Sequence, residues 1–242
     1  MKKVRNYDIN NELLKKYELA AIANAEEILN DAKALLARKS YARSYFLSVA
    51  SIEETGKAFM AFSSRGRNLS NDGLKKKLQK MFEDHPQKII YAFYSWIFAS
   101  SKIEEIKKSA LNAVDIITHL QSGREASMYV DAYPDGSIRI PSKEARPVAA
   151  IDLVKIAENC LHHTKEYVKS NLPKSTSSFD DKLLCIRIEK LQEMYKRKDF
   201  WEFFLARLKT DASNFNYSKA VVTYYDAYFC KKKLFNTKKA NK

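Results

Sequence analysis

Apolar residues recur at a helical period along most of the chain. Between residues 8 and 38 the positions Leu13, Tyr17 and Ile28 share one helix face, and Asp8 or Asn10 can cap the first turn. Ser40 can cap a second helix that runs to about residue 63. The same period predicts further helices over 74–82, 86–101, 102–121, 144–170, 179–197, 199–209 and 217–234.

One segment breaks this pattern. Tyr129–Tyr133 and Ser137–Ile140 flank a Pro-Asp-Gly turn, which predicts a β-hairpin over about 128–141. The Ser-rich stretch 171–178 is typical of a linker. We therefore expect an all-α protein with a bundle domain over 8–170, a small β-hairpin insertion, and a basic helical C-terminal extension over 171–242.

Composition fits this picture and excludes several classes. The chain has 242 residues, 45% of them hydrophobic, and only five Gly and five Pro, so it can bury a core in long helices. The N-terminus lacks a signal-peptide pattern, and the longest apolar run, Ile89–Ala99, is too short for a membrane span. We expect a cytoplasmic protein with no membrane partner. Cys160, Cys185 and Cys230 are widely spaced, so core thiols are expected, with neither disulfides nor a metal site.

The net charge of +14 favours an acidic partner such as nucleic acid. Residues 171–242 hold sixteen Lys or Arg against eight Asp or Glu, so they carry a surplus of eight positive charges. Lys231, Lys232 and Lys233 lie in this section and are candidates for RNA contact. Such a terminal run is, however, more often a solvated tail than a specific binding element.

The second helix carries ions in an otherwise apolar stretch. Arg43, Glu54 and Lys57 lie on one stripe, and Glu53 stands beside them. An amphipathic helix with ordinary surface ion pairs is one interpretation. However, Arg43 is the single charged residue between positions 41 and 52, which is typical of a central helix whose ions pair or act.

Two further places could carry chemistry. His85 precedes a proline at a predicted helix start, where it could bind phosphate together with Lys88, whereas His119 is expected to pack in the core. Arg124 follows a helix end, and Tyr129 and Asp131 open the hairpin. Arg124 could hold a phosphate in bidentate fashion, or it could form an ion pair with Asp131 or Glu125.

Taken in order, three segments resemble one family. YARSYFLSVASIEETGKAFMAF (41–62), DHPQK (84–88) and GREASMYVDAYPDGSIRIP (123–141) are similar to AbiV-type abortive-infection proteins, a branch of the HEPN superfamily. The resemblance covers about 12–170. It implies a HEPN-like helical bundle that forms a homodimer, needs no cofactor, and stops phage propagation by shutting down translation in the infected cell.

Many HEPN proteins are metal-independent ribonucleases that use an Arg followed by a His. Here the positions five to seven residues after Arg124 are Tyr129, Val130 and Asp131, and a tyrosine with a pKa near 10 is a poor general base. The resemblance therefore supports two hypotheses, each with a phage-encoded activator as a further expected partner. In one, the protein cuts tRNA, mRNA or rRNA; in the other, it binds and blocks a translation component or phage product.

The cleavage hypothesis assigns roles to the residues singled out above. The expected catalytic group is Arg124, Tyr129, His85, Glu54 and Lys57, with Glu54 and Lys57 orienting Arg124. Phosphate contacts are expected from Lys88, Arg43 and the three lysines 231–233. Glu53 and Asp131 are expected to give structural support.

Overall fold

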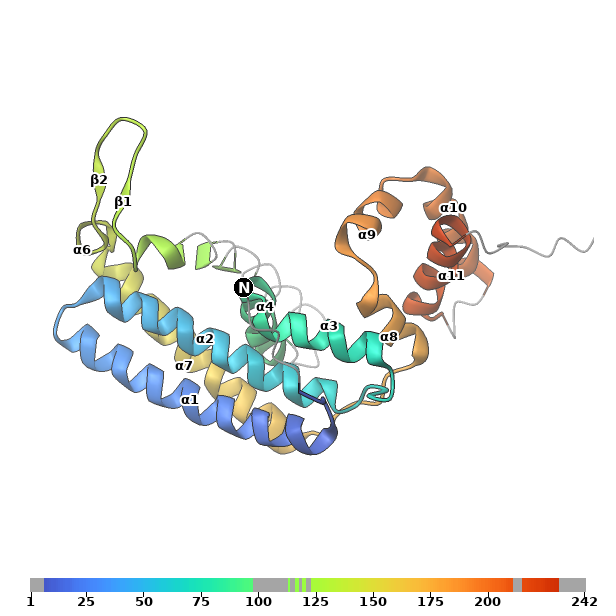
Figure 1. The fold of residues 1–242 in the computed structure, drawn as a ribbon, viewed down its shortest axis with the longest axis horizontal. Helices are drawn as coiled ribbons and strands as arrows, with labels where there is room; N and C mark the ends of the chain where they lie inside the picture. The colour runs from blue at the N-terminus through green and yellow to red at the C-terminus, as the bar shows by residue number, and fades with distance from the viewer. Residues whose placement is uncertain are drawn as a thin grey trace, which may run out of the picture. The chain divides into compact units, whose positions relative to one another are not determined.

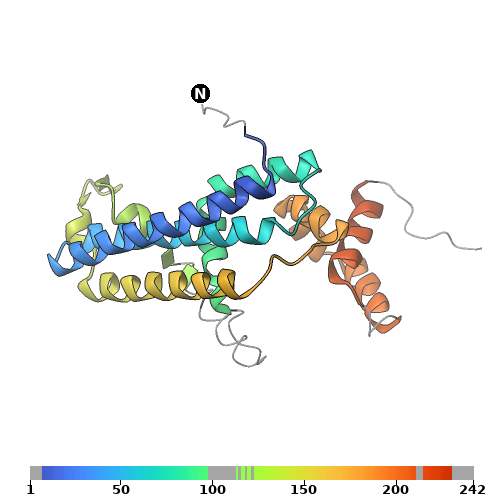
Figure 2. The same ribbon diagram turned by 90° about the horizontal axis from the view of Figure 1, so that it is seen from below.

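Three long helices form the main body of the protein. The structure is a computed structural model that describes residues 7–97, 113, 116–117, 119–120, 123–210 and 215–230. Helices α1 (Asn11–Ala37), α2 (Tyr41–Ser64) and α7 (Pro147–Ser170) lie side by side (Figures 1 and 2), each in contact with the other two. Their core includes Ala25, Leu29, Val49, Ile52, Leu153, Ala157 and Cys160.

Small residues allow α1 and α2 to pack closely. Ser44 and Ser51 are fully buried on α2, and their hydroxyls donate to carbonyl oxygens of α1, to Ala32 at 2.8 Å and to Ala25 at 2.8 Å. These bonds satisfy the hydroxyls and pin the two helices in register. Of the two expected caps of α1, Asn10 is the one that caps the helix, because its Oδ1 accepts from Leu13 N at 2.9 Å. Ser40 precedes α2, but its side chain makes no capping hydrogen bond.

Two short helices follow α2. Helix α3 (Asp72–Glu83) is basic outside and apolar inside, and α4 (His85–Ile97) crosses α2. The crossing occurs at Gly56, where a Cβ would overlap the Lys88 carbonyl oxygen. Glycine is therefore the only residue that lets the two backbones touch here. The helix predicted over 102–121 lies largely outside the described residues.

The predicted hairpin is present and shorter than expected. Strands β1 (Asp131–Ala132) and β2 (Ile138–Arg139) pair antiparallel, with Asp131 opposite Arg139. Gly136 has a φ of 82°, a value that glycine adopts without strain, and closes the turn. The hairpin projects from one end of the bundle, next to the short helix α6 (Pro141–Glu144) (Figure 1).

The chain divides into two compact units, and Arg67–Lys77 groups with Ser175–Lys242 in the second. Helices α8 (Ser178–Cys185), α9 (Ile188–Tyr195), α10 (Lys198–Thr210) and α11 (Tyr217–Phe229) belong to this unit. Met194, Phe200, Val221 and Tyr224 form its core. The single helix predicted over 179–197 is wrong, because the backbone is extended at Ile186 and Arg187 and separates α8 from α9.

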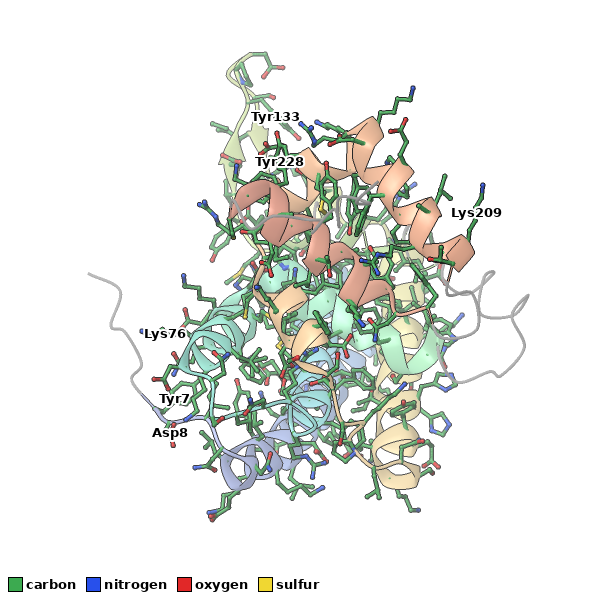
Figure 3. All side chains as sticks on the ribbon, turned by 90° about the vertical axis from the view of Figure 1, so that its right-hand side faces the viewer. Tyr7, Asp8, Lys76, Tyr133, Lys209 and Tyr228 are labelled. Atoms are coloured by element: carbon green, nitrogen blue, oxygen red, sulfur yellow. The ribbon has the colours of Figure 1, made fainter. Side chains whose placement is uncertain are left out.

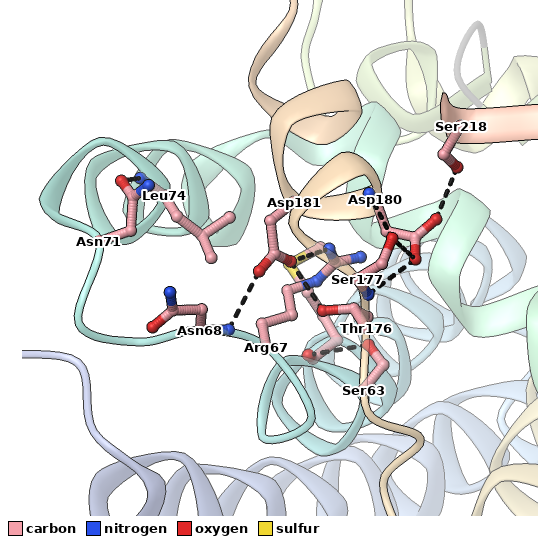
Figure 4. A network of polar contacts seen from close by, with 11 residues as sticks. Ser63, Arg67, Asn68, Asn71, Leu74, Thr176, Ser177, Asp180, Asp181 and Ser218 are labelled. Atoms are coloured by element: carbon pink, nitrogen blue, oxygen red, sulfur yellow. Dashed lines mark hydrogen bonds and ion pairs between the residues drawn. The ribbon is translucent and has the colours of Figure 1, made fainter. Parts of the chain in front are cut away.

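Two aspartates organise the polar contacts of this second unit (Figure 4). Asp181 accepts from Arg67 at 2.9 Å, from Asn68 N at 3.1 Å and from Thr176 at 2.8 Å. Asp180 belongs to the capping box of α8 and accepts from Ser218 at 2.5 Å. The hydrogen bond from Ser218, together with those from the N-cap residue Ser177, holds the pKa of the Asp180 carboxyl below its usual range.

Candidate functional site

A buried carboxylate on α2 gathers three nitrogen-bearing side chains. Glu53 is only 7% exposed at its side chain, and its Oε2 lies 2.7 Å from His85 Nδ1 and 3.1 Å from Lys88 Nζ. Its Oε1 lies 3.0 Å from Arg124 Nε. Residues from three separate parts of the chain thus meet at one acidic group.

The crossing of α2 and α4 places two of these side chains. Gly56 follows Glu53 by three residues and shares its helix face, so the start of α4 passes directly over that face. Asp84 fixes the start of α4, because its Oδ1 accepts from Gln87 N at 2.9 Å. His85 and Lys88 lie one turn apart on α4 and therefore both reach Glu53.

A second close contact places Arg124. Residues 123–126 are helical, and a Cβ at Gly123 would come 2.5 Å from the Tyr45 hydroxyl of α2. The guanidinium of Arg124 lies 5.7 Å from the centre of the Phe46 ring, within cation–π range. Ser127 Oγ donates to the Arg124 carbonyl at 2.7 Å and closes the turn behind it. Arg124 is thus held from its backbone and over an aromatic face.

The hydrogen-bond balance assigns the tautomer of His85. Nδ1 lies 2.7 Å from the Glu53 carboxylate and 3.1 Å from the Lys88 ammonium, and it cannot donate to one and accept from the other at once. A carboxylate only accepts, and an Nδ1 lone pair 2.7 Å from it would be repelled, so Nδ1–H donates to Glu53, while Lys88 is held to the same carboxylate as an ion pair. Nε2 then carries the lone pair, on a side chain that is 49% exposed. A histidine held in this way can act as a general base toward solvent.

The charges of the cluster favour an anion. One carboxylate faces the permanent cations of Lys88 and Arg124, so positive charge remains after pairing. Arg124 Nε–H does not point along its contact with Oε1, and within the described part of the chain Oε1 accepts no hydrogen bond. The pair is therefore held by charge, and the guanidinium donors are not all committed to Glu53. A phosphate group would supply the missing negative charge and the oxygen acceptors for the free guanidinium donors of Arg124.

The expectation that Glu54 orients Arg124 is wrong. Glu54 pairs with Lys57 one turn along α2, and Glu53 is the residue that holds Arg124. The reason is geometric, because adjacent helical residues point 100° apart and the face of Glu53 meets α4. Lys57 is committed to Glu54 and does not orient Arg124 either.

Among the described residues, Arg43, Tyr129 and Asp131 form neither a hydrogen bond nor an ion pair with Glu53. Arg43 is exposed and precedes Glu53 by ten residues, roughly 15 Å along the helix axis at 1.5 Å per residue. Tyr129 is 56% exposed, and Asp131 pairs with Arg139 at 3.4 Å rather than with Arg124. Lys231, Lys232 and Lys233 lie outside the described residues.

Sequence reasoning overlooked the glycines that build the site. A glycine inside a helical pattern costs helix stability relative to alanine and so points to a packing constraint, which made Gly56 a usable signal. Phe46, Tyr45 and Gly123 carried none that distinguishes them from ordinary core residues. Across the ranges that the structure describes, no group of three or more His, Cys, Asp or Glu side chains is placed to hold a metal ion. In the same ranges no helix is long and apolar enough to cross a membrane.

Comparison with known protein families places most of this chain in one family. The family model of AbiV, a HEPN family, matches residues 13–162, which contain all four residues of the cluster. The chain belongs to the AbiV family. Neither a curated protein nor a solved structure gives a significant match. The resemblance noted in the sequence is confirmed, and so is the all-α fold with a small hairpin. In this AbiV-family protein the matched region ends within α7, before helices α8 to α11.

Proposed function

We propose that this AbiV-family protein is an abortive-infection effector that cleaves RNA at the cluster around Glu53. Membership of the family supports a role in stopping phage propagation. The single observation that carries the catalytic part is the 2.7 Å contact between buried Glu53 and Nδ1 of half-exposed His85. This contact orients a general base beside two cations.

The proposed reaction uses the ribose 2′-hydroxyl as nucleophile. His85 Nε2 takes the proton of the 2′-hydroxyl, and the oxygen attacks the adjacent phosphorus. Arg124 and Lys88 stabilise the charge that develops on the phosphate oxygens. The bond from phosphorus to the 5′-oxygen breaks, and the proton passes from His85 to the leaving oxygen. The products are a 2′,3′-cyclic phosphate and a 5′-hydroxyl.

Glu53 supports this step without touching the substrate. Its carboxylate accepts from Nδ1–H, which keeps the lone pair on Nε2 and stabilises the imidazolium once the proton has moved. Because it is buried against Lys88 and Arg124, it also fixes the two cations in space. Glu53 is a positioning residue, and His85 and Arg124 are the groups that meet RNA, whereas Lys88, with a side chain only 6% exposed, acts on the phosphate through its charge alone.

The test compares purified variants on total RNA. We expect the wild-type protein to cut RNA, alone or after addition of extract from phage-infected cells, and His85→Ala to lower the rate by at least about a hundredfold. Arg124→Ala should lose activity and toxicity together. His162→Ala is the matched control, because this histidine is exposed on α7 away from Glu53, and it should cut normally. Intact RNA in every condition, with an Arg124→Ala variant as toxic as wild type, would refute cleavage.

A non-catalytic function is the second candidate. It is favoured by the absence of a histidine five to seven residues after Arg124, where Tyr129, Val130 and Asp131 stand. In that case the surplus positive charge around Glu53 binds an anionic group of a translation component or phage product without breaking a bond. A partner that is still captured by the His85→Ala and Tyr129→Ala variants, with no cut RNA, would favour this function.

A further inference from the structure

The projecting hairpin has two chemically different faces. Asp131 pairs with Arg139 across the strands, and Ala132 pairs with Ile138. Because successive side chains in a strand point to opposite faces, Asp131, Arg139 and Tyr133 share one face and Ala132 and Ile138 the other. The Arg139 guanidinium lies 5.8 Å from the centre of the Tyr133 ring, which agrees with this division. Figure 3 labels Tyr133 on this hairpin.

We infer that the Tyr133 face stacks an unpaired base of single-stranded RNA and so selects this class of substrate. The inference rests on the cleavage proposed above, because it supplies a contact for the strand beyond the reacting phosphate. Tyr133 is 45% exposed, and Arg139 lies over its ring while Asp131 holds Arg139 at 3.4 Å. A ring held by a cation in this way is a prepared stacking surface.

The position of the hairpin ties it to the site. Arg124 lies in the helical turn 123–126, and the chain passes through Ser127 directly into the hairpin. Nine residue steps separate Tyr133 from Arg124, so even a fully extended chain would place them no more than roughly 30 Å apart at about 3.3 Å per residue. A short run of nucleotides covers such a distance, so a strand bound at Arg124 can reach Tyr133.

The charges of the hairpin favour bases over phosphates. Between residues 128 and 140 the charged side chains are Asp131, Asp135 and Arg139, so this segment is slightly acidic in a strongly basic chain. Asp135 at the turn accepts from Ser137 N and Oγ, and these bonds lower the pKa of its carboxyl and keep it ionised. Acidic groups repel phosphates, whereas every base offers a neutral ring face to an aromatic side chain.

Single-stranded RNA suits this surface better than a duplex does. Bases in a duplex are stacked on each other and cannot reach Tyr133, whereas unpaired bases can turn outward onto aromatic rings. The aliphatic face, with Ile138 59% exposed, suits a protein surface instead. The two faces belong to the same hairpin, so each serves as a control for the other.

The experiment measures binding and cleavage in parallel. Binding is measured by titrating a labelled single-stranded oligoribonucleotide, and its duplex, with full-length protein that carries His85→Ala, so that the RNA is not cut during the measurement. The values of kcat and KM are measured with protein that keeps His85. Tyr133→Leu is expected to weaken single-strand binding roughly tenfold, as base–aromatic stacking predicts, and to raise KM with kcat unchanged. Tyr133→Phe keeps the ring and should bind as before. Ile138→Ser, on the opposite face, should also bind as before.

The outcomes separate this inference from the proposed function. RNA that is cut with the same KM by wild type and Tyr133→Leu overturns the stacking contact and leaves cleavage intact. Binding that depends on the Tyr133 ring without any cut RNA overturns cleavage and supports the stacking contact. If Ile138→Ser rather than Tyr133→Leu weakens function, the hairpin is a protein-docking surface and the inference is wrong. A duplex that binds as well as the single strand also refutes it.

Discussion

At the scale of single residues, two adjacent glutamates behave differently. Glu53 is buried and faces Lys88, Arg124 and His85, whereas Glu54 pairs with half-buried Lys57 beside it. A buried carboxylate that loses its charge leaves its cations unpaired in a poorly solvated place. The Glu54–Lys57 pair is partly exposed, at 18% and 20% of the two side chains, so water can still reach Lys57 when its partner is neutral and the loss is smaller. The two positions should therefore respond unequally to the same substitution.

Glu53→Gln should lower the free energy of unfolding by about 3–5 kcal/mol, because it leaves Lys88 and Arg124 facing a neutral amide. Glu54→Gln should lower it by about 1 kcal/mol or less. Urea unfolding followed by circular dichroism measures both. Equal losses for the two variants would mean that Glu53 is not the buried centre of the site.

The sequence could predict which residue types meet at the site, but not which glutamate lies at its centre. His85, Lys88 and Arg124 were identified from their positions at helix boundaries. Glu53 and Glu54 are the same residue type in the same helix, so composition does not separate them. The choice depends on where α4 crosses α2, and this is decided by packing at Gly56.

At the scale of elements, the helix crossing at Gly56 controls the geometry of the site. A Cβ there would meet backbone atoms of Lys88 and Ala92, which cannot turn aside as a side chain can. Helix α4 would have to move off α2, and His85 and Lys88 would move with it. The helix propensity that alanine gains over glycine, about 0.5–1 kcal/mol, is smaller than the cost of this overlap.

Gly56→Ala should lower the free energy of unfolding by about 1–3 kcal/mol and abolish RNA cleavage. The control is Gly73→Ala at the start of α3, where the new Cβ would lie 3.2 Å from the Asn71 side chain and the helix can gain propensity. That variant should be neutral within about 1 kcal/mol and fully active. Thermal unfolding together with the cleavage assay decides between the two. An active and stable Gly56→Ala protein would contradict the crossing.

Most helices could be predicted because their apolar period is long and unbroken. Helices α1, α2 and α3 begin and end within three residues of the expected bounds. The break between α8 and α9 could not be predicted, since Ile186 and Arg187 carry no glycine or proline signal. Their extended backbone follows from the tertiary packing of the second unit, which a local pattern does not contain.

At the scale of the whole molecule, the site and much of the positive charge lie in different parts of the chain. The family match and the Glu53 cluster fall within residues 13–162, whereas residues 171–242 carry eight of the fourteen surplus positive charges. Catalysis by the cluster needs precise distances. General attraction of RNA needs only charge and acts over several ångströms through solvent. Added salt should therefore weaken the general attraction of RNA while leaving the rate of cleavage at saturating RNA unchanged.

Replacement of Lys231, Lys232 and Lys233 by Gln tests this division. If each lysine neutralises one phosphate of a single strand, the slope of log affinity against log salt should fall by about 2, at about 0.7 per contact. The rate at saturating RNA should stay unchanged, because the Glu53 cluster is untouched. The matched control replaces Lys16, Lys33 and Lys165, which already pair with Glu12, Glu158 and Glu26. It removes the same net charge and should leave the slope unchanged, because these lysines are not expected to contact phosphate. Equal slopes for the two triple variants would show that the basic end attracts RNA no more than the rest of the surface does.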